Sequence, residues 1–329
     1  MLTLPQDRGP LSASILAWLS DGPAVPPEQA QALVDVVDDP LADGDFQLAL
    51  ACCYELHYRG IDGVDDAFEW DVELLAVRAL LEDAFERALR DAVPEPAVDS
   101  GSVWSDLRAV VASDDGPALS AHLARRATAE EFRDFLAQRS VYHLREADAH
   151  TWGIPRLSGR AKAALVEIQT DEYGGGVFAR MHSTLFAQML RAMGLDDTYG
   201  SHWGEATPET LAGVNAISLF GLHRGHRGAL VGHLAALEMT STEPNRNYGN
   251  GLRRLGYGAR ATAFFDEHVE ADAVHEQVAA VDLCGSLVQA EPELRSAVLW
   301  GAACCLALDA AAGRALLHRW SSAQVSVGA

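Results

Sequence analysis

The sequence is short of basic residues. Lys and Arg together number 25, against 47 Asp and Glu, which gives a net charge of −22 at pH 7. Nucleic acids and anionic membranes bind proteins through basic surfaces, so this balance argues against both as partners. No segment reaches the length of apolar residues needed to span a bilayer, and residues 1–10 lack the basic start and apolar core of a secretory signal. We therefore expect a soluble, cytoplasmic protein.

Cysteine is scarce, and its spacing does not suit a zinc site. The five cysteines form two adjacent pairs and a singleton, with no C-x2-C pattern: Cys52, Cys53, Cys284, Cys304 and Cys305. An odd number of cysteines in a chain without a signal sequence indicates reduced thiols rather than a disulfide framework. We predict that they fill the core on helices.

The apolar–polar alternation of strands is almost absent, whereas helical periodicity dominates. Apolar residues make up 49% of 329 residues, enough for a sizeable core. Caps and prolines mark the ends of several elements. We predict helices beginning at Pro27 and over 47–57, 70–93, one or two within 107–126, then 128–146, 161–172, 208–239, 260–281 and 291–320.

The predicted architecture is an all-α bundle with an N-terminal helical extension. Residues 94–101 contain two prolines and separate the chain into residues 1–94 and 95–329. Flexible linkers between domains are usually longer and more polar than this segment, so we interpret it as a loop. We expect residues 1–94 to pack on the core formed by residues 95–329.

The most informative motif is H-x3-D-x2-H, formed by His268, Asp272 and His275. At about 100° per residue, these three side chains fall within roughly 60° of one another on a helix. The same face carries Phe264 and Phe265, so it is apolar around the motif. An ionised Asp and two imidazoles on a buried face are costly unless a metal or another charge compensates them. The alternative interpretation is a solvated acidic helix with incidental histidines.

Three ligands on one helix cannot complete an octahedral site, so other helices must contribute. His182 lies within what looks like an apolar helix interior, where a hydrogen-bonded core histidine is the alternative. Glu172 is ten residues earlier, about 15 Å away on a straight helix. The glycines 174–176 weaken that helix and allow a kink, or they simply end it.

Two further acids are candidates. Glu146 ends the helix that the capping box of residues 128–131 opens, although Arg145 or Arg156 provides an alternative partner. Glu238 is a single acid inside an apolar helical run, which is unusual for a carboxylate. Four carboxylates would offset the charge of two ferrous ions, and three imidazoles would add neutral ligands. Such a donor set suits iron or manganese better than structural zinc.

These segments resemble one known family. The segments that carry the resemblance are Glu146–Trp152, Asp171–Gly176 continuing to His182, Glu238–Asn245 and the H-x3-D-x2-H motif. Together they resemble the heme-oxygenase-like di-iron oxidases and oxygenases, in particular the actinobacterial iron-containing redox enzymes. The resemblance runs from about residue 55 to near the C-terminus. Carried over by position, it implies the metal ligands Glu146, Glu172, His182, Glu238, His268, Asp272 and His275.

The resemblance also implies a fold and a chemistry. It implies seven core helices in a heme-oxygenase-like bundle, often dimeric, that binds two Fe(II) ions per chain and uses O2 as co-substrate. His182, His268 and one or more glutamates would hold one iron. Asp272, His275 and another glutamate would hold the second, with Glu172 or Glu238 bridging. We predict no catalytic residue beyond these ligands.

Three functions remain open from the sequence. The first is an oxygenase that acts on the amine of a small amino acid-like substrate in secondary metabolism, as a homodimer and with a possible external electron donor. The second is oxidative C–C cleavage or desaturation of an amino acid or fatty acid by the same ligands. The third is a non-enzymatic heme-binding or interaction protein. Four arginines are candidates for a substrate carboxylate clamp but are also typical surface ion-pair residues: Arg224, Arg227, Arg246 and Arg253.

Overall fold

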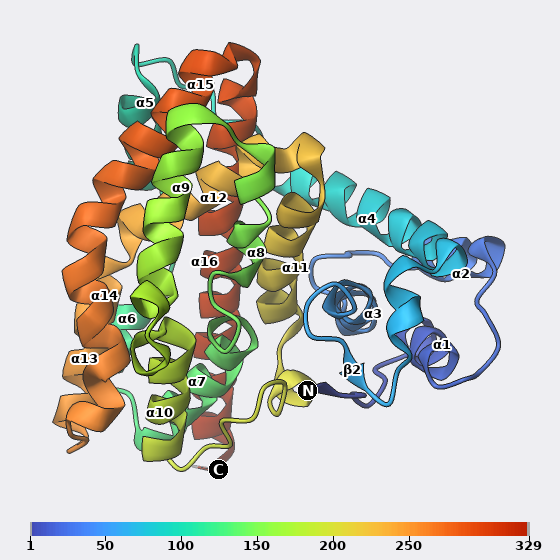
Figure 1. The fold of residues 1–329 in the computed structure, drawn as a ribbon. Helices are drawn as coiled ribbons and strands as arrows, with labels where there is room; N and C mark the ends of the chain where they lie inside the picture. Colours follow the sequence, from blue (N-terminus) through green and yellow to red (C-terminus); the bar gives the residue numbers. More distant parts are fainter. Residues whose placement is uncertain (1, 328–329) are drawn as a thin grey trace.

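A computed structural model describes residues 2–327, apart from the side chains of residues 271–274 and 323–327. It confirms the all-α class, because helices account for nearly all of the regular structure in this part of the chain (Figure 1). The described strands are β1 (Leu2–Thr3) and β2 (Ile61–Asp62), which pair in parallel and tie the N-terminus to the segment after α3.

The N-terminal region forms a smaller group of helices beside the main bundle (Figure 1). Its elements are α1 (Pro10–Leu19), α2 (Pro27–Val34), α3 (Gly44–Glu55), η1 (Asp66–Trp70) and α4 (Val72–Ala92). Helix α3 packs on α11 of the bundle, where Asn215 donates a hydrogen bond to the Gln47 carbonyl at 2.9 Å. One apolar cluster includes residues of both regions. The division of the chain at residue 94 stays a prediction.

The bundle contains the remaining elements. They are α5 (Val103–Ala112), α6 (Leu119–Arg125), α7 (Ala129–His143), α8 (Asp148–Thr151), η2 (Ile154–Arg156), α9 (Gly159–Glu172), η3 (Gly174–Gly176), η4 (Phe178–Arg180), α10 (His182–Ala192), η5 (Trp203–Glu205), α11 (Pro208–Leu222), η6 (Arg224–His226), α12 (Arg227–Thr240), α13 (Thr242–Arg254), α14 (Ala259–Gln277), η7 (Val278–Gly285), α15 (Ser286–Ala290), η8 (Pro292–Leu294) and α16 (Arg295–Val327). Segment η7 is π-helical and continues directly from α14.

Two predicted helices differ from the observed ones. The capping box of Thr128 and Glu131 opens α7 as predicted, but α7 ends at His143 instead of residue 146. The chain turns there because Ala147 adopts a left-handed conformation (φ 72°) that a helix does not allow. The predicted helix over 208–239 is two helices, α11 and α12, separated by the 3-10 turn η6.

The five cysteines are buried and free, which confirms that they fill the core. They lie in α3, η7 and α16. Burial raises the pKa of the Cys53 thiol to about 12, because a thiolate would lose its hydration there. These cysteines therefore stay protonated and contribute to packing.

One helical segment, Pro292–Ser322, is long and apolar enough to cross a membrane, so the expectation that no segment reaches this length was wrong. No charged residue lies between Arg295 and Asp309. However, 56% of its most apolar window is buried inside the protein, where α16 packs against α11 and α12. The same composition is expected of the central helix of a bundle, so this segment is only weak support for a membrane span.

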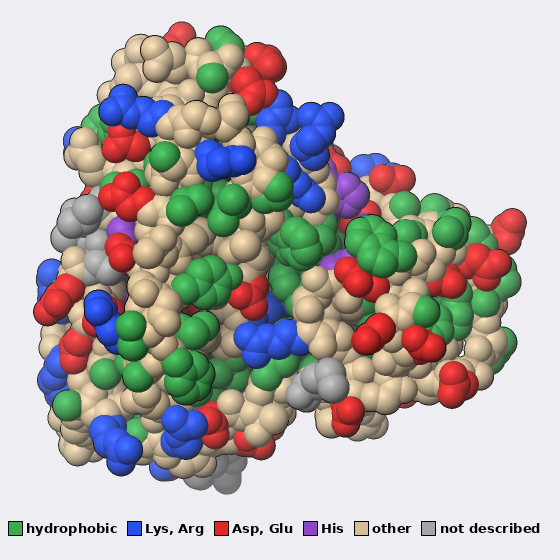
Figure 2. Space-filling model, viewed as in Figure 1, with side chains coloured by type: hydrophobic (Ala, Val, Ile, Leu, Met, Phe, Trp, Pro, Cys, Tyr) green, Lys and Arg blue, Asp and Glu red, His purple; other side chains and the backbone are tan. Residues whose placement is uncertain are grey.

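Charged side chains of both signs are mixed on the surface. On the face shown in Figure 2, Lys and Arg side chains lie among Asp and Glu side chains instead of forming one broad basic patch. This distribution agrees with the acidic composition. The expected absence of a nucleic-acid partner remains a prediction.

Helices α12 and α16 approach each other closely through glycine. A Cβ atom on Gly232 would overlap the carbonyl group of Val298, and one on Gly301 would overlap the backbone of Ala229. Both obstacles are backbone atoms on the facing helix, so no side-chain rotation relieves them. These glycines therefore set the separation of the two central helices.

Replacing Gly232 with Ala should lower the free energy of unfolding by about 1–3 kcal/mol, because it forces α12 away from α16. Urea unfolding of the purified protein measures this change. Gly213→Ala in α11 is the matched control, since a Cβ atom there meets nothing within 4 Å. It should be neutral or stabilising by less than about 1 kcal/mol. Equal effects of both variants would contradict the close helix contact.

Candidate metal centre

Four helices of the bundle (α9, α10, α12 and α14) and the turn between α7 and α8 bring acids and imidazoles together. Their ligand atoms form two groups, and within each group all ligand atoms lie within 4.8 Å of one another. The first group contains Glu146, Glu172, His182 and His268, and the second contains Glu172, Glu238 and His275. The structure thus brings together six of the seven predicted ligands. The seventh, Asp272, belongs to α14, but its side chain lies outside the described part of the chain.

A glycine turn places Glu172 beside His182. Helix α9 ends at Glu172, and Gly174, Gly175 and Gly176 follow with φ values of 63°, 62° and 79°. A Cβ atom on Gly174 would lie only 2.5 Å from the Arg180 backbone, so only glycine fits this reversal. The chain folds back, and Nδ1 of His182 lies 3.0 Å from Oε2 of Glu172. The separation of about 15 Å expected for Glu172 and His182 on a straight helix therefore does not apply.

His182 is the first residue of α10, so the interpretation that it lies in a helix interior was wrong. Its local sequence is apolar because α10 packs its other residues, such as Phe186, into the core. The His182 side chain is only 2% exposed. This position at a helix start points the imidazole toward the end of α9 instead of along the apolar face.

In the first group, His268 is held in one orientation. Its Nδ1 lies 2.8 Å from the Phe264 carbonyl oxygen, which accepts only if Nδ1 carries the proton. Nε2 then carries the ring lone pair and lies 3.6 Å from Oε1 of Glu146. The His268 and His182 rings are 4.3 Å apart between centroids. This backbone contact selects the tautomer that a metal ligand requires.

In the second group, a hydrogen bond also orients the histidine, but here Nδ1 is the nitrogen that faces the interior. Nε2 of His275 donates to Oδ2 of Asp171 at 3.0 Å, which leaves Nδ1 facing the interior. Nδ1 lies 3.4 Å from Oε2 of Glu238. Glu172 belongs to both groups, so its carboxylate lies between them. Asp171 and Glu172 are neighbours at the end of α9, yet they serve different roles.

Several interior-facing atoms lack hydrogen bonds. Glu146 Oε2, His182 Nδ1 and His275 Nδ1 are buried and make no hydrogen bond of good geometry, although both nitrogens lie within 3.4 Å of a carboxylate oxygen. Leaving buried polar atoms unsatisfied costs about 1–3 kcal/mol each. Buried polar atoms that converge with incomplete hydrogen bonding are typical of a ligand-binding site.

Two functional contacts were not predicted from the sequence. Nδ1 of His143 lies 2.7 Å from Oε1 of Glu146, which leaves Oε2 of that carboxylate for another partner. Asp171 orients His275 as described above. The i, i+3 spacing of His143 and Glu146 and the adjacency of Asp171 to Glu172 were visible signals. Neither signal is specific without the tertiary structure.

The arginines considered as partners of Glu146, and two of the four considered as a substrate clamp, have other partners in the structure. Arg145 pairs with Glu55 at 3.1 Å, so it is not the partner of Glu146. Arg156 instead donates to the carbonyl groups at the end of α11. Of the four clamp candidates, Arg227 pairs with Glu291 and Arg253 pairs with Asp266. Among the described residues that line the cavities below, Arg139 is the arginine present.

A cavity of about 80 Å³ lies inside the cluster, and a larger one adjoins it. The small cavity is lined by Glu146, Glu172, Glu238 and His268, together with His150 and apolar residues. The larger cavity has a volume of about 300 Å³. Both are lined by His143, Leu237, Ser241 and Asn245, so these residues form their common boundary.

The environment shifts the pKa values of the cluster. Burial alone would raise the pKa of Glu146, but hydrogen bonds and charges from His143 and His268 lower it well below its usual range. Burial would lower the pKa of His275, but Glu238 and Asp171 outweigh it and raise the pKa to about 9. For His150, burial outweighs the charges of Glu172 and Glu146 and lowers the pKa to about 4. In the metal-free protein the raised pKa of His275 therefore favours a protonated imidazole that pairs with Glu238 and Asp171.

The metal-free protein should lose stability as the pH rises from 6.5 toward 9. His275 has an ordinary pKa of 6.5 and a folded-state pKa of about 9, so its contribution is complete below pH 6.5 and disappears as the pH passes 9. Solvent screening of this partly buried group reduces the full linkage energy, so the expected loss is on the order of 2 kcal/mol. Urea unfolding of the chelator-treated protein at several pH values measures it. The Glu238→Gln variant should flatten this dependence, and an unchanged slope would contradict the assignment.

Comparisons with known proteins agree with this geometry. A sequence model of the iron-containing redox enzyme family matches residues 133–310, more than half of the chain. The matched span contains all seven predicted ligands. A nitrosourea synthase from Streptomyces achromogenes subsp. streptozoticus is 27% identical over 158 residues, which cover 48% of this chain and 34% of that protein. The chain thus matches about a third of the length of this relative.

These matches confirm the resemblance seen in the sequence, and the buried cluster of histidines and glutamates agrees with it. The all-helical fold also agrees with the heme-oxygenase-like bundle that the resemblance implied. The chain belongs to the iron-containing redox enzyme family and is an oxidoreductase.

Proposed function

We propose that this protein binds two ferrous ions inside its bundle and uses O2 to oxygenate the amine nitrogen of a small amino acid-like substrate. The observation that carries this proposal is the convergence of six acid and imidazole side chains from five elements into two overlapping groups. Each group has three or four ligand atoms, and Glu172 is common to both. This arrangement suits two neighbouring ions that share one carboxylate.

The donor set fits iron. The described ligands are three carboxylates and three imidazoles, with no thiolate, and the unpartnered atoms of Glu146, His182 and His275 face inward. Glu146, His182 and His268 would hold one ion, while Glu238 and His275 would hold the other. Asp272 would complete the second position as the fourth carboxylate. Four carboxylates offset the four positive charges of two ferrous ions.

A ferrous pair bound here would supply the electrons for O2 activation. The residues of this chain provide the conditions for that chemistry. The Phe264 carbonyl and Asp171 fix the tautomers of His268 and His275, so their lone pairs face the interior. His143 holds one oxygen of Glu146 and leaves the other unbonded. Leu234 and Leu237 line the small cavity and limit the access of water to it.

The reaction type is supported by the relative. A nitrosourea contains an oxidised nitrogen, so the printed name of the Streptomyces protein indicates chemistry at nitrogen. The match covers about a third of that protein, and we extend only this class of chemistry to the present chain. Oxidative C–C cleavage or desaturation would use the same ligands and is the second candidate. The products of the reaction distinguish the two.

Anaerobic titration should show two Fe(II) ions bound per chain. Glu172→Gln should weaken both sites strongly, because its carboxylate belongs to both groups, whereas Glu238→Gln should remove one ion and leave the other. Equilibrium dialysis with iron analysis gives the stoichiometry. Glu167→Gln is the control on the same helix, since Glu167 is exposed and lies outside both groups. Unchanged iron binding in the Glu172→Gln variant would contradict the proposal.

The iron-loaded protein should consume O2 faster in the presence of its substrate. A panel of amines, amino acids and fatty acids is added to the Fe(II)-loaded protein, and O2 uptake and products are measured by electrode and mass spectrometry. A product heavier by one oxygen atom on nitrogen supports N-oxygenation. Chain-shortened or unsaturated products would instead favour the second candidate.

Other features of the proposal remain predictions. We expect a homodimer in the cytoplasm, an external electron donor and a role in secondary metabolism. A heme-binding protein is the non-enzymatic alternative, and adding heme would then give a strong Soret band without uptake of ferrous iron. An interaction protein with a vestigial site would bind neither. Size-exclusion chromatography with light scattering tests the dimer.

A further inference from the structure

A cavity lined by residues of α6, α7, α13 and α16 adjoins the proposed metal centre. It has a volume of about 300 Å³ and lies between α7, α13 and α16, within the size range of small-molecule sites. Its inner boundary is formed by residues that also line the small cavity, including His143 and Asn245. A molecule in the large cavity would therefore reach the metal centre past these residues.

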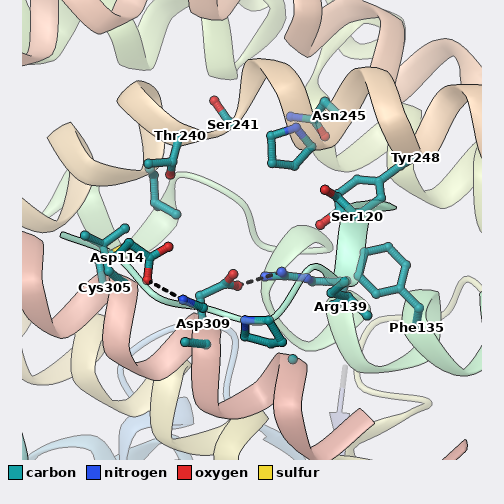
Figure 3. Close-up of a pocket in the computed structure, with 18 of the residues that line it drawn as sticks. Asp114, Ser120, Phe135, Arg139, Thr240, Ser241, Asn245, Tyr248, Cys305 and Asp309 are labelled. Carbon is teal, nitrogen blue, oxygen red and sulfur yellow. Dashed lines mark hydrogen bonds and ion pairs between the residues drawn. The ribbon is translucent and has the colours of Figure 1, made fainter. Parts of the chain in front are cut away.

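The outer part of this cavity carries an acidic polar wall. Asp309 of α16 and Arg139 of α7 form an ion pair at 2.6 Å, and Asp114 lies on the loop before α6. Figure 3 shows Asp309, Arg139 and Asp114 on one side of the cavity and Thr240, Ser241, Asn245 and Tyr248 on the other. Asp114 accepts one hydrogen bond, from the backbone N–H of Gly116 at 3.1 Å. The wall has one more acid than base.

Charge and position suggest which end of a ligand binds here. Arg139 already pairs with Asp309, so an anionic group would have to compete with that pair for the guanidinium. A cationic group can instead contact the remaining oxygens of Asp309 and Asp114 without breaking any pair. Arg139 lies four residues, about 6 Å along α7, before His143 at the end of that helix, and His143 contacts Glu146 at 2.7 Å. The acidic wall and the metal centre are thus separated by the length of a small extended molecule.

We propose that the large cavity is the substrate site and that it binds a small amine with a second, positively charged group, such as a diamine or a basic amino acid. The charged end contacts Asp309 and Asp114, and the other nitrogen lies toward His143 and the metal centre. The identification of the second nitrogen as the reacting atom rests on the proposed function. The binding of the charged end depends only on the cavity.

The test measures binding to the full-length protein by isothermal titration calorimetry, under anaerobic conditions and with Fe(II) loaded. The probe is 1,5-diaminopentane, compared with pentylamine and pentanoate, which have the same chain length but other charges. The diamine should bind at least about tenfold more tightly than either. Equal or tighter binding of pentylamine or pentanoate, or no measurable binding of the diamine, would overturn the proposal.

Four variants identify the contacts. Asp309→Asn and Asp114→Asn should each weaken diamine binding several-fold, whereas Arg139→Gln should preserve or strengthen it. Asp115→Asn is the matched control, because Asp115 neighbours Asp114, is exposed and does not line the cavity. If Asp309→Asn fails to fold, Asp114→Asn still decides the question. Loss of binding in Arg139→Gln alone, or unchanged binding in both Asp variants, would overturn the proposal.

This test separates the two proposals. Normal uptake of two Fe(II) ions without diamine binding would reject the assignment of the cavity and leave the metal centre in place. Diamine binding that persists after chelation, in a protein that takes up no iron, would reject the metal centre and keep the cavity assignment.

Discussion

The main constraint on this structure is the free-energy cost of burying several charged side chains together. Carboxylates and imidazoles from five elements face one another in a cavity of about 80 Å³. Burying such groups is unfavourable unless opposite charge compensates them. In the metal-free protein, protons on imidazoles such as His275 supply that charge. Metal ions would supply it more completely, because they can also satisfy the unbonded oxygen of Glu146 and nitrogens of His182 and His275.

The backbone makes this cluster possible through two uses of glycine. The reversal at Gly174–Gly176 brings the end of α9 against the start of α10, so Glu172 and His182 meet at 3.0 Å. The close contact of α12 with α16 at Gly232 and Gly301 fixes the helix that carries Glu238. In both places a side chain would collide with backbone atoms. The geometry of the cluster therefore depends on residues that do not belong to it.

The residues around the cluster connect it to the rest of the molecule. His143 contacts Glu146 and also lines both cavities, so it lies between the candidate metal ligands and the larger cavity. The family match over residues 133–310 begins within α7 and ends near the middle of α16. The N-terminal helices pack on α11, on another side of the bundle. The six described candidate ligands thus lie in the matched part of the chain, whereas the larger cavity is also lined by residues before it, such as Asp114 and Ser120.

The sequence by itself determined the helical class, the capping box that opens α7, and the types of residue in the cluster. These features depend on local spacing: residues four and seven apart share a helix face whatever the tertiary structure, and three glycines weaken any helix. The tertiary structure decided the rest. Only packing could show that α7 ends at His143, that Arg145 pairs with Glu55 instead of Glu146, and that His143 and Asp171 support the cluster. Only burial could distinguish the apolar segment Pro292–Ser322 as a central helix of the bundle. Contacts between residues distant in the chain depend on how the helices pack against one another. Local periodicity shows which face of a helix is buried, but it does not predict which helix covers that face.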